Sequence, residues 1–432
     1  MLSGGSARAV VVARILGVLA ALAALALVLA GPASAKPKVK SKVHKGTLTV
    51  TGTSANENIV LRLRSGDPTQ VEVVVGADSD FFKRDKFDHI VVDAGGGDDS
   101  VSIDESNGIF TNTELTTLDG GDGNDTLLGG SGAETFMGGD GNDFVDGNRG
   151  NDTAFLGAGD DTFQWDPGDG SDVVEGQDGR DRMDFNGANI NERMEVAANG
   201  GRVRFTRDVA NIVMDLNDVE AINARLLGGA DTLTVGDMSG TDLDTVNSNL
   251  ASSSGGDDLA ADNVIATGTN GDDVATVTGN ASGTSVLGLA TRVNLTGAIA
   301  GSDRVTVNAL AGDDVVDASS LAATGALLTA NGGAGDDVLI GGAGDDTLLG
   351  GDGDDVLIGG PGNDTIDGAP GSDVVLDSLA ANDVSSATAV GTKWVKAHAV
   401  VRKGKTVITV DGEKRKLPRA KLAKLTRGAG IF

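Results

Sequence analysis

Residues 332–376 read GGAGDDVLI GGAGDDTLL GGDGDDVLI GGPGNDTID GAPGSDVVL, which are five nonapeptides in one register without an insertion. An earlier array begins at Gly120 and reads GGDGNDTLL GGSGAETFM GGDGNDFVD GNRGNDTAF LGAGDDTFQ. Trp165-Asp166 then interrupts it, and PGDGSDVVE and GQDGRDRMD follow. Both arrays share the pattern G-G-x-G-x-D-x-U-x, in which U is a large apolar residue. A short fixed period of this kind predicts a repeat architecture rather than independent globular domains.

Each position of the nonapeptide has a physical reason. Gly at the first, second and fourth positions permits tight turns with φ > 0, and the sixth position supplies a carboxylate where the turn ends. The last three residues are β-prone, and one apolar side chain per repeat points inward. In the later array these side chains are Leu339, Leu348, Leu357, Ile366 and Val375. We therefore expect one turn and one short strand per repeat, with two repeats closing one coil of a flattened solenoid.

The stacked turns bring carboxylates close together. Equivalent turns on one side of the solenoid recur every 18 residues in this sequence, and stacked strands pair about 4.8 Å apart. Two ionised carboxylates ~5 Å apart repel by about 3 kcal/mol at an effective dielectric constant of 20, so the turns require a cation. A flexible all-oxygen cage suits Ca²⁺, whereas Mg²⁺ prefers a rigid octahedron. Zn²⁺ prefers His or Cys, which these turns lack.

The repeats resemble those of the RTX, or haemolysin-type, calcium-binding proteins. The resemblance implies a parallel β-roll with Ca²⁺ ions between successive turns on each side, about six ions or more. It implies that the sixth-position acids are ligands, and that the last two repeats of the earlier array join in if Trp165-Asp166 is looped out. The implied ligands are Asp125, Glu134, Asp143, Asp152, Asp161, Asp172 and Asp181 in the earlier array and Asp337, Asp346, Asp355, Asp364 and Asp373 in the later one.

Three features depart from the family pattern. Glu134 replaces Asp, and its longer side chain is expected to weaken that site. Arg149 adds a positive charge to the turn GNRGND. The chain also combines a predicted N-terminal signal with a basic C-terminus, so the one-step export of many family members is not carried over to it.

Composition excludes several function classes. The chain of 432 residues has 66 Gly, 63 Asp and Glu against 34 Lys and Arg, a net charge of −29 and no Cys. Without Cys there is no disulfide framework or thiolate metal site, and the negative charge argues against nucleic acid as a partner. The acids concentrate within residues 46–390, between two basic ends. Such a polyanion is either disordered or neutralised by cations, and the repeats favour neutralisation.

The N-terminus predicts export. Arg8 and Arg14 precede an apolar run at residues 15–30, and residues 33–35 read Ala-Ser-Ala. These features indicate a signal peptide at residues 1–35 that is cleaved near Lys36. The run is shorter than the ~20 residues that span a bilayer, so we expect no stable membrane span after cleavage. The mature protein is predicted to be secreted, extracellular or at the cell surface.

The arrays divide the rest of the chain. The predicted fold class is all-β, a parallel β-roll or β-solenoid with two strict arrays, degenerate coils and a basic C-terminal cap. Its segments are listed here in order: an N-terminal β-strand region at 36–117, the first array at 118–185, a degenerate β-solenoid at 186–330, the second array at 331–376, and a basic hairpin with a short helix at 377–432.

The degenerate coils carry weaker echoes of the turn, such as DAGGGDDSVSI at 93–103 and LLGGADTLTV at 226–235. The acid position in four such echoes is taken by Asp99, Asp231, Asp273 and Asp314. Their irregular spacing does not assure partners on the same side, so metal-free structural turns are the favoured interpretation. The basic C-terminus is interpreted as a cap over the end of a sheet, with contact to an anionic envelope polymer or lipid as the alternative.

No catalytic motif stands out. The sequence lacks H-E-x-x-H and G-x-S-x-G, and His89, the only His well inside the β region, is interpreted as structural. The leading hypothesis is a secreted calcium-binding β-roll that folds on extracellular Ca²⁺. It predicts a non-enzymatic surface, matrix or adhesion component whose partner is a cell-envelope polymer or carbohydrate. The alternatives are a secreted polysaccharide lyase or hydrolase on a β-helix scaffold and a simple calcium buffer.

Overall fold

The computed structural model describes residues 39–256, 258–376, 397–402 and 405–410. The predicted signal peptide at 1–35 and the predicted short helix after Pro418 lie outside these residues. Helical structure in the described part is limited to three 3₁₀ turns, η1 (Arg84–Lys86), η2 (Glu105–Asn107) and η3 (Val209–Asn211). The prediction of an all-β chain is therefore confirmed. None of the described helical segments has the length and apolar character needed to cross a membrane.

Most strands alternate between two sheets, so that each coil contributes to both. Sheet A contains, in spatial order, β1 (Lys40–His44), β2 (Gly46–Thr53), β6 (Phe87–Gly95), β8 (Leu115–Asp122), β10 (Thr135–Asp140), β12 (Thr153–Gly159), β14 (Val173–Gly179), β18 (Ile212–Asn217), β17 (Arg202–Arg207), β16 (Arg193–Asn199), β20 (Thr232–Val235), β22 (Asn263–Thr267), β26 (Arg304–Asn308), β28 (Leu327–Ala334), β30 (Thr347–Asp352) and β32 (Thr365–Asp367).

Sheet B contains the strands between them. In spatial order these are β5 (Asp78–Lys83), β4 (Asp67–Val75), β3 (Asn58–Arg64), β7 (Ser100–Asp104), β9 (Thr126–Leu128), β11 (Phe144–Asp146), β13 (Thr162–Trp165), β15 (Arg182–Asn186), β19 (Ala221–Arg225), β21 (Thr245–Asn249), β25 (Arg292–Thr296), β24 (Gly283–Leu287), β23 (Val274–Asn280), β27 (Val315–Leu321), β29 (Val338–Ile340), β31 (Val356–Ile358) and β33 (Val374–Leu376).

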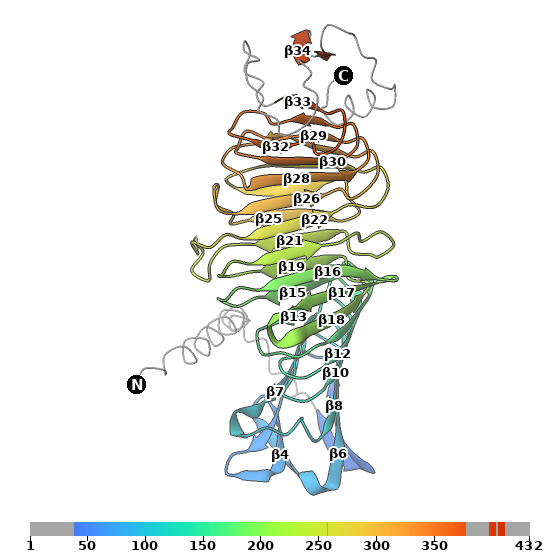
Figure 1. Cartoon of the computed structure of the whole chain (residues 1–432). Helices are drawn as coiled ribbons and strands as arrows, with labels where there is room; N and C mark the ends of the chain where they lie inside the picture. Colours follow the sequence, from blue (N-terminus) through green and yellow to red (C-terminus); the bar gives the residue numbers. More distant parts are fainter. Residues whose placement is uncertain (1–38, 257, 377–396, 403–404, 411–432) are drawn as a thin grey trace, which may run out of the picture. The chain divides into compact units, whose positions relative to one another are not determined.

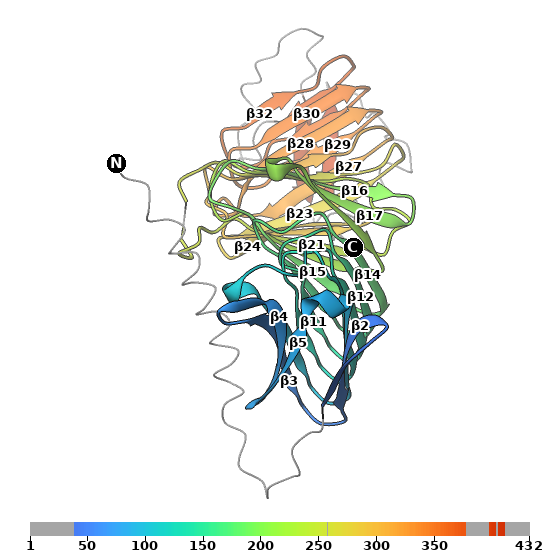
Figure 2. The same ribbon diagram turned by 90° about the horizontal axis from the view of Figure 1, so that it is seen from below.

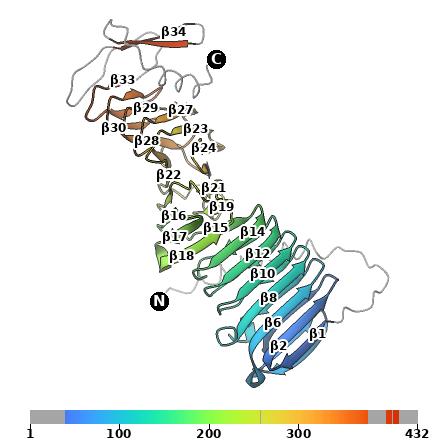
Figure 3. The same cartoon turned by 90° about the vertical axis from the view of Figure 1, so that its right-hand side faces the viewer.

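Neighbouring strands of the arrays pair in parallel with the register that the nonapeptide predicts. Thr135 of β10 lies opposite Thr117 of β8 on one side and Thr153 of β12 on the other. In sheet B, Val145 lies opposite Leu127 and Phe163. Figure 3 shows the strands of sheet A from β2 to β14 side by side. The prediction of a parallel β-solenoid is confirmed by this stacking.

The inward side chains of both sheets form one apolar core. Leu118, Phe136 and Ala154 come from successive strands of sheet A, and Leu127 and Val145 come from sheet B. All five are fully buried. Because side chains alternate across a strand, the flanking Thr and charged residues face outward. The one large apolar residue per repeat therefore fills the core between the two sheets.

The insertion after the fifth repeat, Trp165-Asp166, does not form the loop that the sequence analysis considered. Trp165 is not looped out, because it lies at the end of β13, fully buried and stacked on Phe185 with ring centroids 4.2 Å apart. The turn after β13 absorbs the extra residues, with the Asp169 N–H donating to the Asp166 carbonyl oxygen. The next coil is thereby lengthened without losing register.

Two antiparallel meanders interrupt the parallel stacking between the arrays. Strands β16, β17 and β18 insert into sheet A, and β23, β24 and β25 insert into sheet B. Each meander adds two strands to one sheet, and the two interruptions stand in different sheets. Figure 1 labels the three strands of the first meander, β16, β17 and β18. These excursions explain the irregular spacing of the degenerate echoes.

Antiparallel strands close the N-terminal edge of each sheet. β1 pairs with β2 in sheet A, and β4 and β5 extend sheet B beyond β3; Figure 2 shows β3, β4 and β5 apart from β2. Lys40 and Lys42 are exposed on the edge strand β1, where charge discourages edge-to-edge pairing. Where the sequence places a C-terminal hairpin, β34 (Ala397–Arg402) pairs antiparallel with β35 (Lys405–Val410).

Candidate metal centres

The sixth-position acids of the arrays lie in columns along the solenoid. The Asp125 N–H donates to Asp143 Oδ1 at 2.7 Å, and the Asp143 N–H donates to Asp161 Oδ1 at 2.7 Å. A second hydrogen bond joins the same two turns in the opposite direction, because the Phe144 N–H donates to the Asp125 carbonyl oxygen at 2.8 Å. One carboxylate oxygen of each acid is therefore fixed on the turn of the preceding coil.

Five such columns join the acids of successive turns. The first contains Glu57, Asp99, Asp125, Asp143, Asp161, Asp181 and Glu220, and the second contains Glu134, Asp152 and Asp172. The third, called the central column below, contains Glu192, Asp231, Asp262 and Asp303; the fourth contains Asp273, Asp314, Asp337, Asp355 and Asp373; and the fifth contains Asp346 and Asp364.

The second carboxylate oxygen of many column residues is buried without a hydrogen-bond partner in the described part of the chain. In the two arrays this holds for Asp125, Glu134, Asp143, Asp152, Asp161, Asp181, Asp337 and Asp346. These residues are at most 2% exposed. A buried charged oxygen without a partner is costly, so its regular recurrence indicates a cation between the turns.

The first glycine of the repeat makes room for this oxygen. A Cβ on Gly138 would lie 2.5 Å from Asp143 Oδ2 and 2.0 Å from the Leu156 carbonyl oxygen. In the later array, a Cβ on Gly332 would lie 2.2 Å from the equivalent oxygen, Asp337 Oδ2. The constant spacing from one repeat to the next thus keeps a small oxygen-lined space beside the sixth-position carboxylate.

Burial changes the ionisation of these carboxylates. Desolvation, with a smaller contribution from neighbouring carboxylates, raises the pKa of Asp143 to about 7 and that of Asp152 to about 9. Burial likewise raises the pKa of Asp181 and Asp337 to about 7. Near neutral pH a substantial fraction of each of these groups is therefore protonated, and the ionised carboxylate needs a counter-charge.

The first acids of two columns are held in another way. Glu134 Oε2 accepts from the Gly130 N–H at 3.0 Å, and Asp346 Oδ2 accepts from the Gly342 N–H at 2.7 Å. Both carboxylates fold back onto their own turn, and the longer arm of Glu134 is accommodated within it. Arg149, expected beside a site, is exposed, with its N–H donating to the Gly130 carbonyl oxygen.

The fifth position of the repeat forms a second ladder that the sequence analysis left as an arbitrary residue. Asn124 Oδ1 accepts from the Asn142 N–H at 2.8 Å, and Asn142 Oδ1 accepts from the Asp160 N–H at 2.9 Å. These side chains accept from the following coil, whereas the sixth-position acids accept from the preceding one. The available signal was the prevalence of Asn and Asp at this position in both arrays.

The columns continue into the degenerate coils and include acids that the sequence analysis missed. Asp99, Asp231, Asp273 and Asp314 do have same-side partners, although their spacing is irregular. The missed members are Glu57, Glu192, Glu220, Asp262 and Asp303. A signal existed, because each is followed two residues later by a fully buried or nearly buried apolar side chain: Ile59, Met194, Ile222, Val264 and Val305.

Arginine neutralises two buried Glu residues, Glu114 and the first acid of the central column, Glu192. Arg84 Nε and Nη2 donate to Glu114 Oε1 and Oε2 at 2.7 and 2.9 Å. Arg207 donates to Glu192 in a pair of which both members are at most 3% exposed. The Arg207 guanidinium also lies 5.3 Å from the centre of the Trp165 ring. The protein thus supplies its own cation at these two turns.

The donor set fits Ca²⁺. It consists of carboxylate oxygens with the backbone carbonyls of glycine-rich turns, which are hard oxygen ligands. No three Asp, Glu, His or Cys side chains of the described residues converge on a common point. Each ion therefore needs backbone carbonyl oxygens besides one or two carboxylates, as expected for turns stacked in coils.

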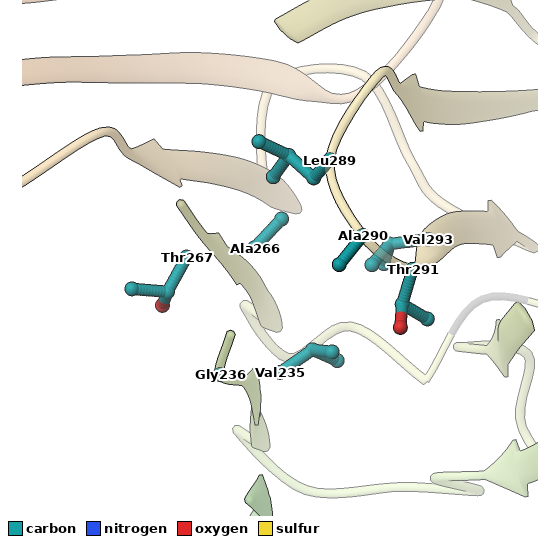
Figure 4. Close-up of a pocket in the computed structure, with 8 residues that line it drawn as sticks. All are labelled: Val235, Gly236, Ala266, Thr267, Leu289, Ala290, Thr291 and Val293. Atoms are coloured by element: carbon teal, nitrogen blue, oxygen red, sulfur yellow. The ribbon is translucent and has the colours of Figure 1, made fainter. Parts of the chain in front are cut away.

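One pocket lies away from the columns (Figure 4). It has an empty volume of about 170 Å³ and is lined by Val235, Gly236, Ala266, Thr267, Leu289, Ala290, Thr291 and Val293. None of these side chains is an acid or base near neutral pH. The pocket therefore contributes no catalytic pair of the kind that the lyase alternative requires.

Comparison with known families identifies the repeats. The family described as "RTX calcium-binding nonapeptide repeat (4 copies)" matches residues 117–133, 128–163, 168–189, 329–357 and 340–375. No match was found among curated proteins. The fold and the columns define a β-solenoid of stacked repeats. More specifically, these residues match RTX calcium-binding nonapeptide repeats, and the match supports a calcium-binding repeat protein.

Proposed function

We propose that this chain is a secreted calcium-binding β-roll that completes its folding on extracellular Ca²⁺ and serves as a non-enzymatic surface, matrix or adhesion component. The observation that carries the proposal is the set of columns of buried carboxylates. Asp143 and Asp337 each have one oxygen bonded to the preceding coil and one without a hydrogen-bond partner among the described residues. Without a cation these turns accumulate buried negative charge. With Ca²⁺, the binding free energy becomes folding free energy.

The proposed ligands are the twelve sixth-position acids of the two arrays, from Asp125 to Asp181 and from Asp337 to Asp373, holding about six ions or more. Ions shared by same-side neighbours would tie successive coils together. Low cytosolic Ca²⁺ would then keep the acidic chain expanded before export. The RTX repeats and the apolar run at residues 15–30 support this sequence of events.

An extended, regular exterior supports the structural role. Thr117, Thr135 and Thr153 stand in one row on sheet A. On sheet B, Asn223 donates to Asp184, and the next two amides continue the ladder through Asn247 and Asn294. Regular polar rows of this kind offer a repeated surface to a cell-envelope polymer or carbohydrate, which is the partner class we propose.

Circular dichroism of the full chain tests the calcium-dependent folding directly. The protein is measured after calcium removal with EGTA, then in millimolar CaCl₂, with equal MgCl₂ as the control for charge and ionic strength. We expect a gain of β signal with Ca²⁺ alone, accompanied by calorimetric binding. Identical spectra in EGTA and CaCl₂, with no heat of binding, would refute the proposal.

Export and the structural role need separate measurements. N-terminal sequencing of protein recovered from the culture medium or cell surface should begin near Lys36. A glycan array and a screen against uronate polymers, both in CaCl₂, then separate binding from turnover. Binding without product supports the proposal, whereas release of unsaturated or reducing ends would replace it with the lyase or hydrolase alternative.

A further inference from the structure

The central column lies between the two arrays, outside the residues that match the RTX family. Its members end the turns before β16, β20, β22 and β26. The Glu192 N–H donates to Asp231 Oδ1 at 2.7 Å, and the Thr232 N–H donates to the Glu192 carbonyl oxygen at 2.9 Å. The same pair of contacts joins Asp125 to Asp143 in the first array. The turn at Asp231 therefore reproduces the array geometry without a nonapeptide.

The backbone of this turn is also that of the arrays. Gly229 stands two residues before Asp231, has φ +121°, and would place a Cβ 2.5 Å from the Ile190 carbonyl oxygen of the preceding coil. In the first array, Gly141 stands two residues before Asp143, has φ +129°, and would place a Cβ 2.0 Å from the Gly123 carbonyl oxygen. In both turns the glycine therefore packs against a backbone carbonyl oxygen of the preceding coil.

The oxygen contacts single out Asp231 within its column. Glu192 is bonded through both oxygens, to Arg207 and to the Ala188 N–H. Asp303 is also bonded through both, to the Asp262 N–H at 3.1 Å and the Ile299 N–H at 2.7 Å. Asp231 is 2% exposed, yet its Oδ2 has no hydrogen-bond partner among the described residues. Asp231 Oδ2 is thus buried and lacks a hydrogen-bond partner among the described residues, as does the equivalent oxygen of Asp143 in the first array.

Charge at the turn also favours a cation. Three acids lie close to the buried Asp231 carboxylate, and their negative charges act on it: Asp262, Glu192 and Asp258. Arg207 offsets Glu192. Asp231 still faces the negative charges of Asp258 and Asp262, and Asp258 Oδ2 accepts from the Gly229 N–H of the same turn at 2.9 Å.

We propose that the turn at residues 226–231 binds a further Ca²⁺ outside both arrays, with Asp231 Oδ2 as an anionic ligand. Backbone carbonyl oxygens of the glycine turn and the carboxylate of Asp262 in the next coil complete its oxygen donors. This inference rests on the proposed calcium-dependent folding of the arrays, and it extends metal binding into coils that no family pattern covers. The ion would hold the first meander to the coils that follow.

Hydrogen exchange of the full chain, calcium-free and in millimolar CaCl₂, tests the site in the wild-type protein. We expect amides at 190–195 and 226–235 to exchange roughly tenfold or more slowly with Ca²⁺. If the arrays respond to Ca²⁺ and these residues do not, this inference is wrong and the proposed function stands. If the arrays also fail to respond, the proposed function fails with it.

Asp231→Asn supplies the matched variant, because Asn retains the acceptor for the Glu192 N–H and removes the charge. We expect one bound calcium fewer by equilibrium dialysis with metal analysis, loss of the Ca²⁺-dependent protection at 226–235, and unchanged protection in both arrays. The control is Asp237→Asn, an exposed residue of the next loop whose Oδ1 accepts from the Ser239 N–H. An unchanged calcium count in Asp231→Asn would overturn the assignment, and the wild-type exchange data decide the question should this variant fail to fold.

Discussion

The backbone N–H of Asp125 donates a hydrogen bond to Oδ1 of Asp143, which stands 18 residues later and directly above it in the next coil. Asp143 Oδ2, by contrast, is buried and has no hydrogen-bond partner within the described part of the chain. One oxygen of this carboxylate thus joins consecutive coils, and the other is the oxygen that we propose as a cation ligand. The same arrangement recurs at Asp125, Asp152, Asp161, Asp181 and Asp337.

Replacing Asp143 by Asn should weaken calcium binding while keeping the contact between coils. The amide oxygen still accepts from the Asp125 N–H, but the anionic oxygen is lost. We expect calcium affinity at this turn to fall by about tenfold or more, which corresponds to about 1.4 kcal/mol. Calorimetric titration with CaCl₂ measures it. Asp237→Asn, which changes an exposed residue outside both arrays, is the control and should bind as the wild type; equal losses in both variants would contradict the assignment.

Adding a methyl group at the first repeat position should destabilise the coil. In Gly138→Ala the new Cβ would lie 2.0 Å from the Leu156 carbonyl oxygen, so backbone must shift. We expect a loss of roughly 1–3 kcal/mol in the free energy of unfolding, as for overpacked cores. Urea unfolding in CaCl₂ measures it. A Cβ on Gly256 meets no atom within 4 Å, so Gly256→Ala should change stability by less than about 0.5 kcal/mol.

Arg207 should be essential to the stability of the meander at β16 to β18. Arg207→Gln leaves Glu192 buried and charged, and breaking a buried pair costs about 3–5 kcal/mol. Chemical unfolding in CaCl₂ measures the loss, and adding Glu192→Gln should recover part of it through a negative interaction term. The control is Arg180→Gln, because the Arg180–Asp244 pair is about half exposed and such pairs contribute about 0–1 kcal/mol. Equal costs for the two arginines would contradict this account.

The calcium-free protein should lose stability as pH rises. Burial raises the pKa of Asp143, Asp181 and Asp337 to about 7, whereas an Asp in the unfolded chain has a pKa of about 3.9. Below pH ~4 both states are protonated, and no penalty exists. Between that pH and the folded pKa the unfolded state releases protons first, so the penalty grows and is complete above the folded values.

Unfolding of calcium-depleted protein at pH 5 and pH 8 tests this sign. The denaturation midpoint should be higher at pH 5 than at pH 8, and CaCl₂ should remove the difference by raising stability at pH 8. Calcium binding near pH 7 should also release protons, which calorimetry in buffers of different ionisation enthalpy detects. A calcium-free protein that grows more stable from pH 5 to pH 8 would contradict the role of burial.

The sequence predicted the regular part of the fold well because the arrays repeat without insertion. The inward positions of Leu339 and Leu348 and the pairing of turns 18 residues apart follow from the period alone. The central coils were harder to predict. The meanders displace partners such as Glu192 and Asp231 by 39 residues, and no local pattern announces which acids will then be neighbours. The role of the sixth-position acids of the two arrays as calcium ligands stays a prediction.

The sequence alone determined the all-β coil, the positions of its glycine turns and the oxygen ligands expected for the proposed cation sites. Each of these follows from steric and electrostatic properties within nine residues. Tertiary structure decided which acids share a column, which buried Glu residues Arg84 and Arg207 neutralise, and why Asp231 differs from Glu192. Those outcomes depend on contacts between coils, and a contact across a meander is set by how the sheets stack rather than by distance along the chain.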